Sequence, residues 1–306
     1  MSEHKFSIEA KKVNKRYAGK ESTKDALTEF NLNIPKGSIY GLLGPNGAGK
    51  STFINILGGL VKKNSGEINI CGINIDTNAK NSRKKIGIVP QELNIDPFFT
   101  PIELLELQAG LYGVRKQERK SEEILSNVGL LDQKNAYART LSGGMRRRLL
   151  IAKALVHNPE VLILDEPTAG VDIELRNNLW KYIKKLNQNG TTICLTTHYL
   201  EEAESLCDHI TIVNHGKVIK SDTKNNLLNL IGKKTVNFIL DKNYSIPNEL
   251  NQFKPTIKDN SLIIHYDKKA IQLKTIIDIL DKNNIIFNEI NTQESDLEDV
   301  FIELTK

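Results

Sequence analysis

Residues 38–52 read Ser-Ile-Tyr-Gly-Leu-Leu-Gly-Pro-Asn-Gly-Ala-Gly-Lys-Ser-Thr, and the rest of the chain can be placed around them. The apolar run 39–43 predicts a short strand, and the last three residues predict the start of a helix. Between the two lies the pattern Gly44-x-x-x-x-Gly49-Lys50-Ser51, which is typical of a phosphate-binding loop. Its glycines let main-chain N–H groups turn inward around an anion, and the positive end of the following helix adds to that field.

The chemistry of this loop suits a nucleoside triphosphate. Lys50 can reach the β- and γ-phosphates, and Ser51 can hold Mg²⁺. We therefore expect the loop to bind ATP with Mg²⁺; the alternative is an ordinary glycine-rich connection between a strand and a helix. The residues expected at the phosphates are Gly44, Pro45, Asn46, Gly47, Ala48, Gly49, Lys50, Ser51 and Thr52.

Composition limits what kind of protein this is. The chain has 306 residues, 39% of them hydrophobic, and a net charge of +5 from interspersed charges, which excludes wholesale disorder and argues against a dedicated nucleic-acid binder. No apolar run approaches the roughly 18 residues of a membrane-spanning helix, and the first residues do not form a signal peptide. We expect a cytoplasmic protein that acts on a membrane only through a partner.

A second polar site follows the apolar run Val161-Leu-Ile-Leu, which predicts a strand buried on both faces and ends in Asp165 and Glu166. Side chains alternate along a strand, so the two carboxylates should point in different directions and take different roles. One can bind Mg²⁺ through its water shell, and the other can activate a water molecule. The alternative is a simple turn at Asp-Glu-Pro.

Three further side chains are candidates for the same site. Gln91 follows the short strand 86–90 and can touch Mg²⁺ or the attacking water, although an exposed polar residue is the plainer interpretation. His198 lies just beyond the strand 191–196, at the end that faces the ligand crevice of such sheets, and can contact the γ-phosphate. Tyr17 can stack on a purine ring or can simply pack.

The segment Leu141-Ser142-Gly143-Gly144-Met145 predicts a second anion site, separate from the first. Ser142 is a natural N-cap for a helix that runs through Leu155, and the two glycines leave the free amides approachable. The run Arg146-Arg147-Arg148 follows, and we interpret it as a solvated helix face rather than a nucleic-acid contact.

The predicted elements indicate an α/β fold. Two antiparallel strands precede the loop, a helix begins at the capping box Thr100-Pro-Ile-Glu, and a second helix spans about residues 117–128. A closing helix is predicted over 221–231. We expect a nucleotide-binding domain at 6–231, with helices at about 92–158, and a small α+β domain without chemical motifs at 233–306, for dimer contacts or modulation.

Taken together, these motifs resemble the ATP-binding cassette (ABC) ATPases over residues 6 to about 225. Each motif has a counterpart in that family, in the family's order: Tyr17 as the adenine-stacking aromatic, 44–52 as Walker A, Gln91 as the Q-loop, 141–145 as the signature, 161–166 as Walker B, 169–172 as the D-loop and His198 as the switch histidine. The resemblance implies a P-loop NTPase fold, with a RecA-like parallel-sheet core, an antiparallel β subdomain and an α-helical signature subdomain.

The tail Glu298-Asp-Val-Phe is similar to that of exporter-type cassettes, and residues 172–176 with 196–204 look like a YadG-like bacterial branch. Met145 stands where many importers carry glutamine.

The resemblance also implies a mechanism. Two copies close head to tail, so that Ser142, Gly143 and Gly144 of one copy, with Asp172 of the D-loop, complete the ATP site of the other. Asp165 and Gln91 would join Ser51 in holding Mg²⁺, Glu166 would polarise the attacking water, and His198 would stabilise the transferring phosphoryl group.

The implied function is the ATP-hydrolysing motor subunit of an exporter, docked through about residues 91–113 on a separate membrane permease. The protein would then lie at the inner face of the membrane, with no specific nucleic-acid partner. One alternative is a soluble ABC ATPase acting on ribosomes or nucleic acid, and another is a metabolite kinase. The single Walker A, the single signature and the lack of extended heptads argue against the first, and the second anion site argues against the kinase. The transported cargo is not encoded in these motifs.

Overall fold

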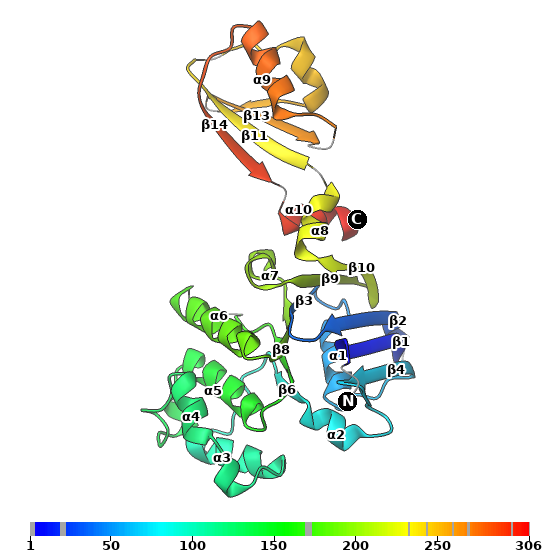
Figure 1. The fold of residues 1–306 in the computed structure, drawn as a ribbon, viewed down its shortest axis with the longest axis vertical. Coiled ribbons are helices and arrows are strands. Elements are labelled where there is room, and N and C mark those ends of the chain that lie inside the picture. Colours follow the sequence, from blue (N-terminus) through cyan, green and yellow to red (C-terminus); the bar gives the residue numbers. More distant parts are fainter. Residues whose placement is uncertain are drawn as a thin grey trace. The chain divides into compact units, whose positions relative to one another are not determined.

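The computed structural model describes residues 4–18, 23–168, 173–231, 233–242, 244–258, 260–267, 270–294 and 296–305. The chain forms two compact units, residues 1–222 and 223–306 (Figure 1).

The first unit is built on a six-stranded sheet with the order β10-β9-β3-β8-β7-β6. Its strands are β3 (Ile39–Leu43), β6 (Ile86–Val89), β7 (Val161–Asp165), β8 (Thr192–Thr197), β9 (His209–Asn214) and β10 (Lys217–Thr223). β3 runs parallel to β8 and β9, and β7 runs parallel to β6 and β8. Every residue of β3, β7 and β8 is buried, as expected for central strands covered on both faces. The predicted α/β fold with a parallel core is confirmed.

A second, antiparallel sheet has the order β2-β1-β4-β5. It contains β1 (Phe6–Ala18), β2 (Thr23–Pro35), β4 (Ser65–Ile70) and β5 (Ile73–Asn74). Helix α1 (Lys50–Leu57) belongs to the same apolar core as both sheets. The rings of Phe30 on β2 and Phe53 on α1 lie 4.9 Å apart, and both side chains are fully buried. Burial of each such ring contributes about 1.5–3 kcal/mol.

The remaining helices of this unit pack on the parallel sheet or on one another (Figure 1). They are α2 (Ala79–Lys84), α3 (Pro101–Leu111), α4 (Ser121–Asn127), α5 (Gly143–Leu155), α6 (Ile173–Gln188) and α7 (Leu200–Leu206), with short 3₁₀ turns at Lys116–Glu118 and Ala138–Thr140. Helices α3, α4 and α5 share a core of their own around Leu105, Leu125 and Leu149. The predicted capping box at Thr100 and Glu103 is confirmed in both of its hydrogen bonds.

The predicted helix over 117–128 is wrong at its start. A 3₁₀ turn ends at Glu118, Arg119 is extended, and α4 begins at Ser121. The guanidinium of Arg119 donates to Glu106 on α3, 2.8 Å away, and the hydroxyl of Ser121 bonds the same carboxylate. This cross-link to α3 accompanies the break in the helix.

The second unit holds α8 (Lys224–Ile231), β11 (Lys233–Leu240), a 3₁₀ turn (Asn248–Phe253), β12 (Thr256–Lys258), β13 (Ser261–Asp267), α9 (Leu273–Lys282), β14 (Phe287–Glu294) and α10 (Leu297–Thr305). Its antiparallel sheet has the order β12-β13-β11-β14, and α9 covers one face of it (Figure 1). Ile276 and Leu280 of α9 pack on Phe238 of β11 in a core separate from that of the first unit. The predicted mixture of strands and helices in this region matches these elements.

The predicted closing helix over 221–231 is corrected at its first turn. Residues 217–223 form β10, and the helix begins only at Lys224. The hydroxyl of Ser221 bonds Tyr40 at 2.9 Å and Thr211 at 2.8 Å, a partly buried network that fixes this segment as a strand. Helix α8 contacts α10 within the second unit, whereas the sequence grouped residues up to 231 with the first. The functional boundary stays a prediction.

Among the helices of the described residues, none combines the length and the apolar character needed to cross a bilayer.

His157 gives the first unit a pH-dependent stability. Its ring stacks on Tyr112 with centroids 3.7 Å apart, and its Nε2 lies 3.1 Å from the carbonyl of Ile86. Burial lowers the pKa of His157, and the bond to Ile86 opposes this only in part. The unfolded chain therefore takes up the proton more readily, so the neutral ring stabilises the fold fully above about pH 6.5 and less as the pH falls below it.

We expect the free energy of unfolding in urea to decrease from about pH 7.5 to about pH 5.5, and to decrease less in His157→Gln. The fluorescence of the only tryptophan, Trp180, reports on this unit. An identical decrease in the wild type and the variant would contradict the assignment.

Candidate functional site

The loop between β3 and α1 is clamped between two strands through its glycines. A Cβ atom on Gly44 would lie 2.3 Å from the carbonyl oxygen of Val213 on β9. Gly49 has a φ of +108°, and a Cβ there would lie 2.5 Å from the carbonyl oxygen of Ala26 on β2. Both positions therefore accept only glycine, because any side chain would push the loop away from the two strands.

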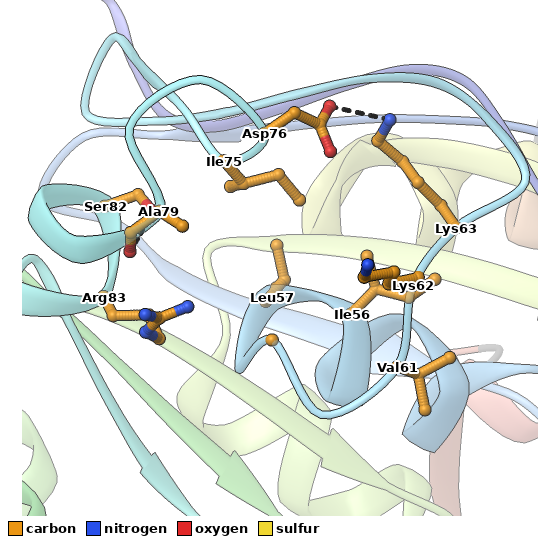
Figure 2. Close-up of a pocket in the computed structure, with 11 residues that line it drawn as sticks. Ile56, Leu57, Val61, Lys62, Lys63, Ile75, Asp76, Ala79, Ser82 and Arg83 are labelled. Atoms are coloured by element: carbon orange, nitrogen blue, oxygen red, sulfur yellow. Dashed lines mark hydrogen bonds and ion pairs between the residues drawn. The ribbon is translucent and has the colours of Figure 1, made fainter.

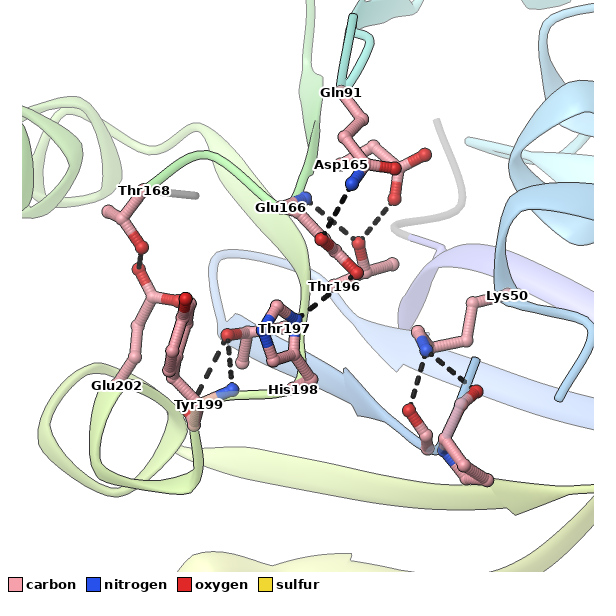
Figure 3. Close-up of polar contacts among 12 residues, drawn as sticks. Lys50, Gln91, Asp165, Glu166, Thr168, Thr196, Thr197, His198, Tyr199 and Glu202 are labelled. Carbon is pink, nitrogen blue, oxygen red and sulfur yellow. Dashed lines mark hydrogen bonds and ion pairs between the residues drawn. The ribbon is translucent and has the colours of Figure 1, made fainter. Parts of the chain in front are cut away.

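Lys50 is buried at the base of this loop, with 5% of its surface exposed. Its Nζ donates to the carbonyl oxygens of Gly44, at 2.6 Å, and Pro45, at 3.2 Å (Figure 3). Burial lowers the pKa of Lys50, whereas the negative charges of Glu166 and Asp165 raise it. The carboxylates thus favour the charged ammonium that burial opposes.

A hollow of about 280 Å³ surrounds the loop. It brings together most of the residues that the sequence had singled out separately. Its lining consists of Tyr17, Lys24, Ala26, Asn46, Gly47, Ala48, Gly49, Lys50, Ser51, Thr52, Gln91 and Glu166. The sequence analysis missed Lys24, which is the register partner of Tyr17 across the β1–β2 pair and could have been found from that pairing.

The carboxylates of Asp165 and Glu166 have different partners, but Glu166 lies beyond the end of β7, so the alternation of the strand does not set its direction. Asp165 ends β7, and its carboxylate accepts a hydrogen bond from the hydroxyl of Thr196 on the neighbouring strand β8. The main-chain N–H of Glu166 donates to the same threonine, with Oγ1 and the carbonyl oxygen each 3.1 Å away. Glu166 has a φ of +47°, a left-handed conformation that costs a non-glycine residue about 1–3 kcal/mol and occurs mainly at functional sites.

The carboxylate of Glu166 is held from two sides (Figure 3). Nε2 of Gln91 donates to its Oε2 at 2.8 Å, and Nδ1 of His198 lies 3.4 Å from its Oε1. Gln91 is exposed, as the plainer interpretation of the sequence expected, but its side chain is committed to this contact. The three candidates from three separate segments therefore form one cluster.

The signature residues Ser142, Gly143 and Gly144 lie at the start of helix α5. Ser142 caps α5, and its Oγ accepts from the N–H of Met145 at 3.2 Å. A Cβ on Gly143 would meet nothing within 4 Å, so this helix end is open to a ligand. Ser142, Gly143 and Gly144 do not line the hollow around Lys50 in the described part of the same chain. Asp172 lies in the stretch 169–172, outside the described residues.

The three consecutive arginines do not form the solvated face that the sequence predicted. Arg146 donates to the carbonyl oxygens of residues 138 and 139, Arg147 to those of 90 and 91, and Arg148 to those of 128 and 129. The prediction is wrong because all three side chains bond main-chain carbonyl oxygens, and Arg147 is buried while Arg146 and Arg148 are half-buried.

A larger hollow, of about 360 Å³, lies between the end of α1 and α2 (Figure 2). It shares no lining residue with the hollow around Lys50. Among the described residues that line it, Asp76 is a carboxylate paired with Lys63 at 2.8 Å, and Lys62 and Arg83 are further basic groups. This larger hollow contains neither the Lys50 loop nor Glu166, so the hollow around Lys50 is the candidate active site.

Comparison with known proteins agrees with this geometry. The family model described as ABC transporter matches residues 27–169. The linearmycin resistance ATP-binding protein LnrL of Bacillus subtilis is 41% identical, over 75% of this chain and 73% of its own. A Nod factor export ATP-binding protein I of Cupriavidus pinatubonensis is 39% identical, over 72% and 67%, and the daunorubicin resistance ATP-binding protein DrrA2 of Streptomyces coeruleorubidus is 36% identical, over 79% and 74%.

Among solved structures, the dimeric post-hydrolysis state of the cassette MJ0796 bound to ADP and Pi is similar, with a TM-score of 0.64. It is 32% identical and covers 71% of this chain and 98% of that one. The chain belongs to the ABC transporter family as an ATP-binding subunit. Its enzymatic activity is that of an ATPase, and the fold is the P-loop cassette that the motifs predicted.

Thr196 is a test of how the two carboxylates are held. Thr196→Val keeps the shape of this fully buried side chain but removes the hydroxyl that bonds Asp165. We expect kcat for ATP hydrolysis to fall roughly tenfold with little change in KM, because Asp165 and Glu166 are misplaced while the phosphate loop is intact. Thr196→Ser, which keeps the hydroxyl, should lie close to the wild type. Equal rates in both variants would contradict this role.

Proposed function

We propose that this chain is the motor subunit of a membrane exporter and converts ATP and water to ADP and phosphate. The cluster of Gln91, Glu166 and His198 beside the Lys50 loop carries this proposal. In this proposal Glu166 accepts a proton from water, Gln91 orients that carboxylate, and the ring of His198 contacts the γ-phosphate.

Each loop residue has a task in this proposal. The ammonium of Lys50 exchanges its bonds to Gly44 and Pro45 for phosphate oxygens, and main-chain N–H groups of the loop surround the β-phosphate. The ring of Tyr17, 39% exposed at the edge of the hollow, stacks on the adenine.

The residues around the loop also suit Mg²⁺. Ser51 and Gln91 line the hollow, and Asp165 ends β7 next to Glu166. Their hydroxyl, amide and carboxylate oxygens are the ligands that this ion prefers, and they would hold it beside the phosphates. When bound, Mg²⁺ supplies positive charge against the transferring phosphoryl group.

The hydrolytic step follows from the position of Glu166. Its carboxylate accepts a hydrogen bond from a water molecule whose oxygen attacks the γ-phosphorus, while the bond to the bridging oxygen of ADP breaks. Gln91 orients the same carboxylate, and His198 donates to the γ-phosphate as its charge redistributes.

We further propose that two copies close head to tail around two ATP molecules. The start of α5 supports this arrangement, because it is open to a ligand and does not line the hollow of its own chain in the described residues. In the closed dimer, Ser142 and Gly144 could therefore contact the γ-phosphate held by the other copy. The similarity to the dimeric cassette MJ0796 also supports it. Asp172 would lie at this interface.

The partner is proposed to be a separate integral-membrane permease at the inner face of the membrane. Exposed apolar side chains within residues 91–113 support a docking surface there: Phe98 is 70% exposed, Leu107 51% and Leu111 74%. Exposed apolar surface marks interaction sites where it is contiguous. The relatives are named for linearmycin resistance, daunorubicin resistance and Nod factor export, which supports export as the direction. The permease would select the cargo.

Glu166→Gln tests the chemical step. The amide cannot take up a proton from water, so we expect steady-state ATP hydrolysis to fall by about 100-fold or more while ATP binding persists. Chromatography with light scattering should then detect a dimer with ATP that is lost with ADP or after chelation of Mg²⁺. Unchanged hydrolysis would overturn the role of Glu166, and a strictly monomeric ATP-bound variant would overturn the dimer.

Phe98→Asp tests the docking surface. We expect it to abolish copurification of integral-membrane protein from detergent-solubilised membranes, since a charge at an apolar interface must be desolvated. Basal ATP hydrolysis should stay near the wild-type rate. Ile286→Asp, at a 59% exposed apolar residue of the second unit, is the matched control and should copurify normally. Copurification with ribosomes at low salt instead would favour the soluble alternative.

A further inference from the structure

Arg147 lies on a buried face of the helix that begins at the signature. Arg147, Leu150 and Ala154 of α5 are spaced by three and seven residues and are all buried, so they share one side of the helix. That side packs on β6: a Cβ on Gly87 would lie 2.4 Å from the carbonyl oxygen of Ala154. Arg147 is two turns closer to the signature than Ala154, at the end of β6 where the chain continues to Gln91.

The guanidinium of Arg147 donates hydrogen bonds to two main-chain carbonyl oxygens at that point. Nη1 donates to the carbonyl oxygen of Pro90 and Nη2 to that of Gln91, each at 2.8 Å. The side chain of the same Gln91 donates to Glu166. A continuous series of contacts thus runs from the start of α5 through Arg147 and Gln91 to the carboxylate proposed to polarise the water.

The electrostatics tie Arg147 to the same site. Only 5% of its surface is exposed, and burial lowers its pKa, whereas the charges of Asp165 and Glu166 raise it. Arginine stays charged under these conditions. Burying a charge that bonds only two carbonyl oxygens costs free energy of desolvation, and an apolar residue at this position would pack without that cost. The planar fork, however, holds two successive carbonyls in a fixed orientation, which a lysine or glutamine does not.

We propose that Arg147 is a positioning residue that holds the main chain at Gln91 in a fixed place relative to the signature helix. When the signature binds the ATP of a second copy, this connection positions the side chain of Gln91 on Glu166. This inference rests on the proposed head-to-tail motor. Arg147 does not line the hollow around Lys50. It therefore affects the rate of hydrolysis and not the binding of ATP.

The test compares Arg147→Gln and Arg147→Lys with Arg148→Gln in the full chain. Arg148 is the matched control: it is the next residue of α5 and also donates to two main-chain carbonyls, of Val128 at 2.8 Å and Gly129 at 3.0 Å, but away from Gln91. Loss of either arginine should weaken the fold, which urea unfolding measures. Only loss of Arg147 should free the main chain around Gln91.

We expect Arg147→Gln to lower kcat for ATP hydrolysis about 10- to 100-fold with KM within about threefold, since small misplacements at a reacting centre have effects of this size. Arg147→Lys should be intermediate, and Arg148→Gln should stay near the wild-type kcat. In the nucleotide-free protein, hydrogen exchange of the amides at 88–93 should be faster in Arg147→Gln alone. In a Glu166→Gln background, Arg147→Gln should still dimerise with ATP.

Three outcomes would overturn the positioning role: a wild-type kcat in Arg147→Gln, equal losses of kcat in Arg147→Gln and Arg148→Gln, or unchanged exchange at 88–93. A wild-type protein that neither hydrolyses ATP nor dimerises would instead overturn the proposed motor. The exchange measurement, which needs no nucleotide, would still report on the contact itself.

Discussion

Burial of helix α1 between two sheets is the constraint on which the rest of the molecule depends. Phe53 packs on Phe30 of the antiparallel sheet, and the same core reaches Ile163 of the parallel sheet. The loop that precedes this helix touches both sheets through Gly44 and Gly49, where a methyl group would collide with a main-chain carbonyl. Contacts with both sheets therefore position the phosphate loop. Because these contacts hold the loop on either side, it forms a rigid binding site for a charged ligand.

The parallel sheet then assembles the chemistry at one edge. Strands β6, β7 and β8 are neighbours, and Gln91, Glu166 and His198 each follow the carboxyl end of one of them. Parallel strands end at the same edge, so Gln91 and His198, far apart in sequence, come within 2.8 and 3.4 Å of the carboxylate of Glu166. Thr196 bonds across the β7–β8 pair, which links the direction of Asp165 to the backbone of Glu166.

Sequence reasoning succeeded where a local pattern has one physical solution. The loop, the capping box at Thr100 and the buried strand before Asp165 each follow from spacing and side-chain type alone. It failed where distant partners decide. Ser221 was placed in a helix because its network with Tyr40 and Thr211 cannot be read locally. Arg147 was read as solvated because charge usually means exposure, and the carbonyls that satisfy it come from another segment.

The sequence by itself determined the family and the ATPase chemistry, because these are properties of short motifs with fixed spacing. Tertiary structure alone decided which of those motifs meet within one chain. Gln91 and Glu166 line the hollow around Lys50, and His198 lies against Glu166, whereas the signature residues are not among the described residues that line this hollow. The reason is that chain order fixes spacing along a strand or helix, while contact between segments depends on how sheets and helices pack, which no single segment encodes.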